Sequence, residues 1–246
     1  MENTLMIGVV SLLCIFAHVP SLLLRIVPFH EKISAKDKCR LTVIYLAGLA
    51  VDFGICMWMG INQVIDVPFY KVNLIVFCIV MAVVNVQIVR GYTKVHLFVF
   101  GIVADIVMIT LAVGAYISSH LGMQGDAAGI AQTSVIAIII YAVLYPLLRR
   151  LMRYTVTPFL EIDCKNYWDS IWFIPIALFF ASIFSDSADV YTSTFGQMLS
   201  KCLIGAATIL LCIAIARDHQ RFRNEEKMNQ QIDQQKGYYQ ALTGQV

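Results

Sequence analysis

Long apolar stretches, repeated along most of the chain, are the feature that most constrains its fold. A bilayer core about 30 Å thick is crossed by a helix of roughly 20 mostly apolar residues. Seven such stretches cover residues 4–29, 41–65, 69–89, 96–121, 133–148 with an extension toward 154, 168–184 and 199–216. The sixth is the weakest because it is short and contains Pro175. Seven spans in 246 residues leave no room for a sizeable domain outside the membrane.

The composition excludes a water-soluble single domain. Only 14% of the residues are charged and 59% are hydrophobic, whereas soluble domains have about 25% charged and about 45–50% apolar residues. No basic segment precedes the first apolar stretch and no cleavage pattern follows it, so we expect a retained helix rather than a signal peptide. The nearly balanced charge gives no argument for nucleic-acid binding. The sequence therefore predicts an all-α polytopic bundle whose surroundings are the lipid bilayer.

The basic residues predict an orientation. If all seven stretches cross the membrane, 16 of the 18 Lys and Arg residues, Arg25 among them, lie on the side of the C-terminal tail. Only Lys71 and Lys201 lie on the opposite side. Positive charge accumulates on the cytoplasmic side of membrane proteins. We therefore expect the N-terminus outside and the C-terminus in the cytoplasm. Removing the sixth span would break this alternation.

Four polar residues fall inside predicted spans at similar depth: His18, Asp52, Asn85 and Asp105. A carboxylate at the bilayer centre costs about 2.5–3.5 kcal/mol on insertion scales, so its presence requires a reason. One interpretation is a polar cluster that binds a ligand or couples helix positions to a signal. The alternative is interhelical hydrogen bonding, an ordinary role of His and Asn in membrane helices. Both interpretations stay open for the two aspartates.

Sequence motifs for catalysis are absent. The chain has no H-E-x-x-H, G-x-S-x-G or P-loop pattern and no Cys/His cluster with metal-ligand spacing. We expect no catalytic residue, metal or cofactor in this chain.

The chain changes character after Ala216. Residues 217–246 are rich in charged residues and helix formers and contain no proline, so the seventh helix is expected to continue into the cytoplasm. A heptad pattern predicts a dimerisation seam along this helix. The seam consists of Met228, Ile232, Tyr239, Leu242 and Val246, with a polar break at Gln235. The alternative is a frayed tail, favoured by Gly237, because glycine disfavours helix. The chain is therefore expected to consist of two units, a sensor bundle at 1–216 and a signalling helix at 217–246.

This tail carries a family resemblance. An Arg-rich exit from the last span precedes four glutamines and a Tyr-Tyr-Gln-Ala-Leu run: Arg217, Arg221, Arg223, Gln230, Gln231, Gln234, Gln235 and 238–242. In these features the chain resembles the membrane sensor region of bacterial sensor histidine kinases of the GHKL type, similar to quorum-sensing peptide-receptor kinases. The phosphoacceptor histidine box and the ATP-binding domain of that family are absent from these 246 residues. The resemblance implies a bacterial inner-membrane location, a homodimer, and a response regulator as partner only where kinase domains follow.

These observations leave three alternative functions open. The leading one is a receptor that detects a small ligand or short peptide and passes the change along the seventh helix to a histidine kinase module. The alternative is a small-solute transporter or proton-coupled permease built around Asp52 and Asp105. The third is a membrane scaffold that recruits a cytoplasmic partner through the tail. No residue pattern chooses among a peptide, a lipid and a hydrophobic metabolite as ligand.

Overall fold

The computed structural model describes residues 2–62, 67–122, 127–160, 168, 171–184 and 193–243. Within these ranges the regular elements are all helices, which confirms the predicted all-α class. The α-helices are α1 (Glu2–Ile26), α2 (Ala35–Ile61), α3 (Val67–Ile88), α4 (Thr93–His120), α5 (Ala127–Thr155), α7 (Ile174–Phe184) and α8 (Phe195–Thr243). Two short 3-10 turns, η1 (Val27–Phe29) and η2 (Thr157–Leu160), follow α1 and α5.

Five helices are long and apolar enough to cross a membrane, namely α1, α2, α4, α5 and α8. The described apolar parts of the other two, 76–88 in α3 and 174–184 in α7, are shorter. At 1.5 Å per residue the 11 residues of α7 extend roughly 17 Å, which is less than the thickness of a bilayer core. The crossing of all seven stretches therefore stays a prediction.

Several helices begin ahead of the apolar runs, whereas α7 begins at Ile174, inside the run 168–184. Helix α2 begins at Ala35 rather than at residue 41, because Ser34 caps it: the Ser34 hydroxyl oxygen accepts the Asp37 N–H at 3.1 Å. Such a cap satisfies one of the N–H groups that the first turn leaves without a partner. Helix α5 likewise begins at Ala127, ahead of the predicted 133. The first residues of α2 are mostly polar and carry no apolar signal, which is why a hydropathy scan misses them.

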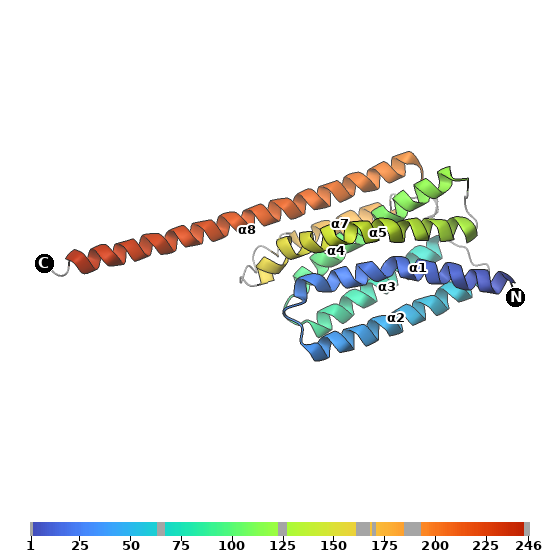
Figure 1. Cartoon of the computed structure of the whole chain (residues 1–246), viewed down its shortest axis with the longest axis horizontal. Helices are drawn as coiled ribbons and strands as arrows, with labels where there is room; N and C mark the ends of the chain where they lie inside the picture. Colours follow the sequence, from blue (N-terminus) through green and yellow to red (C-terminus); the bar gives the residue numbers. More distant parts are fainter. Residues whose placement is uncertain are drawn as a thin grey trace.

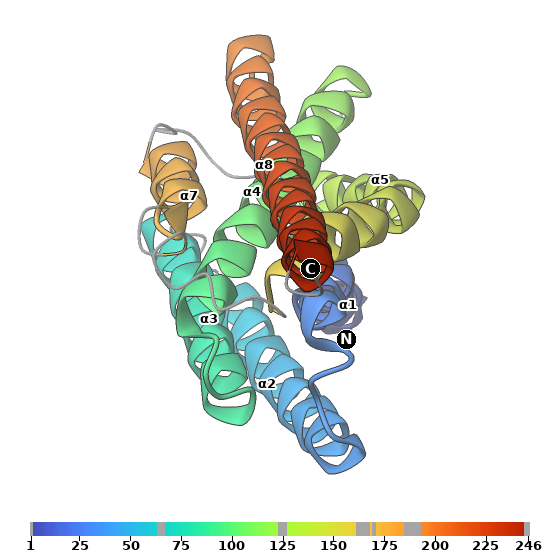
Figure 2. The ribbon, with the colours of Figure 1, turned by 90° about the vertical axis from the view of Figure 1, so that its left-hand side faces the viewer.

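Helix α4 is the centre of the bundle. It packs against α1, α3, α5, α7 and α8, while α1 lies between α2 and α5, and α2 pairs with α3. Figure 2 shows this arrangement with α7 beside α3 and α4 and with α5 on the opposite side. Glycines permit two of the close approaches: Gly101 faces the backbone at Pro175 of α7, and Gly114 faces the Thr133 carbonyl of α5.

The bundle buries polar groups and exposes apolar ones. Large exposed hydrophobic side chains occur along the outer faces of the helices, among them Leu5, Phe16, Val43, Leu46, Val143, Leu147 and Leu203. Buried polar side chains include Ser11, His18, Ser21, Arg25, Asp52, Asn85, Asp105, Thr110, Thr133 and Thr208. Water would penalise this arrangement, whereas lipid favours it. The helices are thus those of a chain compatible with a membrane protein.

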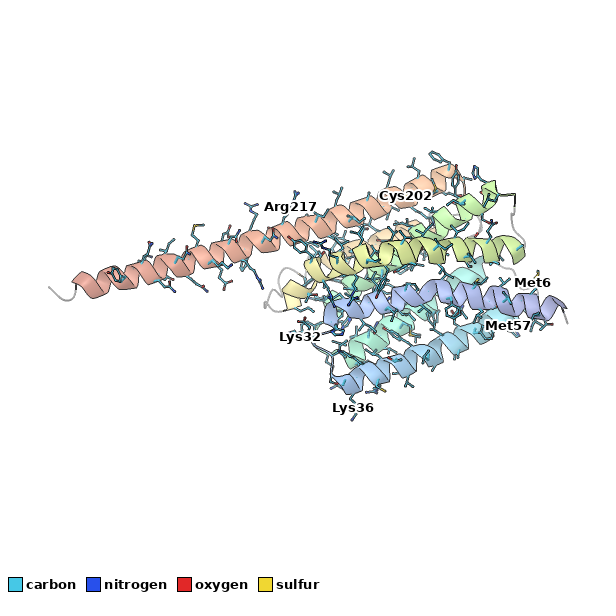
Figure 3. All side chains as sticks on the ribbon, in the orientation of Figure 1. Met6, Lys32, Lys36, Met57, Cys202 and Arg217 are labelled. Atoms are coloured by element: carbon cyan, nitrogen blue, oxygen red, sulfur yellow. The ribbon has the colours of Figure 1, made fainter. Side chains whose placement is uncertain are left out.

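Helix α8 extends far beyond the bundle. It runs unbroken over 49 residues, and its C-terminal half projects away from the other helices (Figure 1). The α1–α2 and α3–α4 turns and the end of α5 lie at the end of the bundle from which α8 emerges. Figure 3 places Lys32, Lys36 and Arg217 at that end and Met6 and Met57 at the other. Basic residues therefore gather where α8 leaves the bundle.

Candidate functional site

The four polar residues expected at the bundle centre are all buried. They do not form one cluster, because the rotation of each helix directs them to different neighbours. His18 and Asp52 share a cavity, Asn85 pairs with a tyrosine of α2, and Asp105 faces α8. Whether they bind a ligand stays a prediction.

The first cavity, here called the Asp52 cavity, lies between α1, α2 and α3. It is lined by Cys14, Ile15, His18, Asp52, Cys56, Asn73 and Phe77. The Asn73 amide donates to Asp52 Oδ1 at 3.0 Å, and His18 lies within electrostatic range of the same carboxylate. The space holds roughly one water molecule. This arrangement can hold a water or a proton next to a carboxylate and an imidazole.

Asn85 serves a different contact. Its side-chain carbonyl oxygen accepts the hydroxyl of Tyr45 at 2.5 Å, and both residues are buried. This bond joins α2 to α3, away from the residues that line the Asp52 cavity. The geometry matches the interhelical hydrogen-bond interpretation of Asn85.

Asp105 connects the central helix to α8. Its Oδ2 accepts the Thr208 hydroxyl at 3.1 Å, while Oδ1 has no hydrogen-bond partner in the described part of the chain. Asp105 is 1% exposed. One turn away, a Cβ at Gly205 would overlap Ile109 Cδ1, so α8 approaches α4 closely at this level. A polar contact and a tight apolar contact thus dock α8 on α4 side by side.

Arg25 is a buried charge that sequence reasoning did not single out. The sequence places Arg25 near the cytoplasmic end of the first predicted span, and in the structure it lies in the last turn of α1 with 5% exposure. Its Nη2 lies 3.7 Å from Cys78 Sγ, and its Cζ lies 4.9 Å from the centre of the Phe100 ring. Nε and Nη1 have no hydrogen-bond partner among the described residues. A charged side chain at membrane depth costs about 2.5–3.5 kcal/mol on insertion scales.

Arg25 lines a second cavity, here called the Arg25 cavity, between α1, α3, α4 and α7. Its walls are His18, Ser21, Leu22, Arg25, Phe77, Cys78, Ala104, Val107, Met108 and Phe179. His18 and Phe77 also line the Asp52 cavity, so the two cavities are adjacent. The spacing of His18, Ser21 and Arg25 on α1 is the signal that could have revealed the site, because residues three and seven apart share a helix face.

Other chemistry finds little support in the described part of the chain. No group of three His, Cys, Asp or Glu residues there is arranged to hold a metal ion.

The residues of the predicted seam lie on or beyond α8. Met228 and Ile232 are exposed, the side chains of Tyr239 and Leu242 lie outside the described set, and Val246 lies outside the described residues.

Comparison with known proteins adds no assignment. No family model matches the chain, and neither a curated protein nor a solved structure is significantly similar to it.

Proposed function

We propose that this chain is the membrane sensor of a receptor, in which the helix bundle responds to a small ligand or short peptide and α8 transmits the response. The observation that carries the proposal is the docking of α8 on the bundle's central helix. The Asp105–Thr208 hydrogen bond and the Gly205–Ile109 contact lie on the same unbroken helix that leaves the bundle. A change around α4 therefore acts directly on the projecting rod.

The proposed mechanism is a population shift between two packings of α8 on α4. A ligand that binds one packing better shifts the equilibrium by its differential affinity. Because a helix is stiff, rotation or tilt at Thr208 is carried along α8 to residues beyond 217. The Asp52 cavity, or the adjacent Arg25 cavity, is where a ligand group would bias the equilibrium.

In the proposed receptor, the C-terminal part of α8 forms a parallel dimer in the cytoplasm. The described side chains from 217 to 238 are exposed in this single chain, including the seam residues Met228 and Ile232. A second copy would bury that face as a coiled coil. The basic residues at this end support a cytoplasmic location by the positive-inside rule. A histidine kinase module is the partner that the tail resemblance favours.

Cysteine crosslinking in native membranes tests this function. Met228→Cys and Ile232→Cys, in a background whose native cysteines are replaced, should crosslink between chains. The matched controls Gln230→Cys and Gln234→Cys lie at f and c positions of the same heptads and should not. Uniform crosslinking at the four sites, or none, would contradict the dimer.

A second measurement tests the transmission step. Thr208→Val removes the donor to Asp105 while keeping the side-chain shape, and should change the ratio of crosslinking at 228 and 232. Ser200→Ala, which alters an exposed hydroxyl-bearing residue of α8, is the control. An unchanged crosslinking ratio in Thr208→Val would show that the packing of α8 on α4 does not affect the tail, and it would count against a receptor.

Proton-coupled transport is the alternative, favoured by the carboxylate and imidazole of the Asp52 cavity. It predicts that proteoliposomes carry a proton flux, detected by a trapped pH dye, that Asp52→Asn or Asp105→Asn abolishes. Deleting residues 224–246 should leave that flux intact. A receptor predicts the opposite: no flux, and signalling that depends on the tail.

A further inference from the structure

We propose that the Arg25 cavity is a binding site for one small monovalent anion, of the size of a halide or formate. The proposal concerns the resting occupant of this cavity and holds whether the chain senses or transports.

Arg25 brings a permanent positive charge into the cavity. A guanidinium stays protonated in proteins and has five N–H donors. In the described part of the chain its contacts are the Cys78 sulfur and the face of Phe100, and no carboxylate is among them. A thiol sulfur is a weak acceptor, and a ring face compensates a buried charge only in part. Among the described contacts of the guanidinium, therefore, none compensates its positive charge.

The residues of the cavity wall decide which acceptors reach the guanidinium of Arg25. Leu22, Ala104, Val107, Met108 and Phe179 offer no acceptor to the two unpartnered guanidinium nitrogens. The hydroxyl of Ser21, also in the wall, donates to the His18 carbonyl at 2.6 Å. The described wall therefore supplies no acceptor to Nε and Nη1, and a bound anion would supply one. A buried charge is costly unless it is paired, so an anion satisfies the site better than a neutral molecule does.

The direction of the Arg25 side chain and the size of the cavity decide which anion fits. Side chains of a helix lean toward its N-terminus, so Arg25 reaches back into the bundle instead of out of its basic end. The cavity holds roughly one water molecule. This space suits a halide or the head of formate, whereas sulfate or gluconate would have to push α1, α3 and α4 apart.

Anion-dependent stability of the full chain in lipid nanodiscs tests the site. Thermal unfolding is followed in sodium chloride, bromide or formate, with sodium gluconate as balance at constant ionic strength. The wild type should gain stability in a saturable manner, with the unfolding equilibrium constant falling about 100-fold at 100 times the Kd. The halide and formate arms distinguish the two kinds of anion.

Arg25→Gln should abolish the dependence, and Arg25→Lys should retain it with a weaker affinity because the charge remains. Arg153→Gln, which alters an exposed arginine of α5, is the matched control and should respond like the wild type. Line broadening of the chloride NMR signal gives a second readout that does not depend on stability. It should appear with the wild type and disappear with Arg25→Gln.

The same experiments can overturn the proposal. An equal response of Arg25→Gln and wild type, or no response of the wild type in either readout, would mean that the cavity is only a water-filled polar pocket.

Discussion

Replacing Gly101 by alanine should disrupt the contact between α4 and α7. A Cβ at this position would lie 2.6 Å from both the Ile176 nitrogen and the Pro175 carbonyl carbon, whereas ordinary contacts begin at 3.4 Å. Backbone atoms cannot rotate away, so the two helices must separate by about 0.8 Å at this level. Overpacking of this kind costs about 1–3 kcal/mol. For a chain of this length 2 kcal/mol corresponds to a fall in Tm of roughly 4–8 °C.

The assay is thermal unfolding of the purified chain in nanodiscs, reported by a thiol-reactive dye that labels the buried Cys14 and Cys212 on opening. Replacing the exposed Cys39 by serine lowers the background labelling. Gly54→Ala is the matched control, because a Cβ there meets nothing within 4 Å and alanine only improves helix propensity, by at most about 1 kcal/mol. Equal melting of Gly101→Ala and Gly54→Ala would refute the close packing of α4 on α7.

Three further predictions concern single contacts. Gly114→Ala would place a Cβ 2.8 Å from the Thr133 carbonyl oxygen, so a loss of about 1–3 kcal/mol is expected in the same unfolding assay, and melting like that of Gly54→Ala would contradict it. Ser34→Ala removes the cap of α2 and should cost about 1 kcal/mol; faster hydrogen exchange of the amides at 36–38 is the measurement, and unchanged exchange would show that the cap is dispensable. Tyr45→Phe removes the donor to Asn85 and should cost about 0.6–1.7 kcal/mol, with a double-mutant cycle against Asn85→Ala isolating the pair; a coupling energy of zero would exclude the hydrogen bond as a stabilising contact.

Hydropathy was sufficient to predict the helices but not their ends. In lipid every backbone polar group must be satisfied within the segment, so apolar runs of membrane length indicate helices directly. The continuation of the last helix past Ala216 followed from its helix-forming composition, and α8 runs unbroken to Thr243. The early start of α2 depended on the Ser34 cap, which involves polar residues that a hydropathy window does not register.

The candidate site was predictable only in part. Insertion cost correctly singled out His18, Asp52, Asn85 and Asp105 as residues that the bundle must bury. Their partners, such as Asn73 for Asp52 and Thr208 for Asp105, lie on other helices. Nothing in the spacing of one helix gives the rotation of its neighbour.

The sequence by itself determined the class, the helices and the long final rod, because these depend on local composition and on the thickness of a bilayer. The tertiary structure decided which polar groups meet. Helices that are apolar on every side have no hydrophobic force to orient them, so small residues and interhelical hydrogen bonds set their rotation. That rotation joins Asp105 to α8 and turns Arg25 inward against Cys78 and Phe100. A charge that sequence reasoning used only for the orientation thereby becomes part of the bundle's interior.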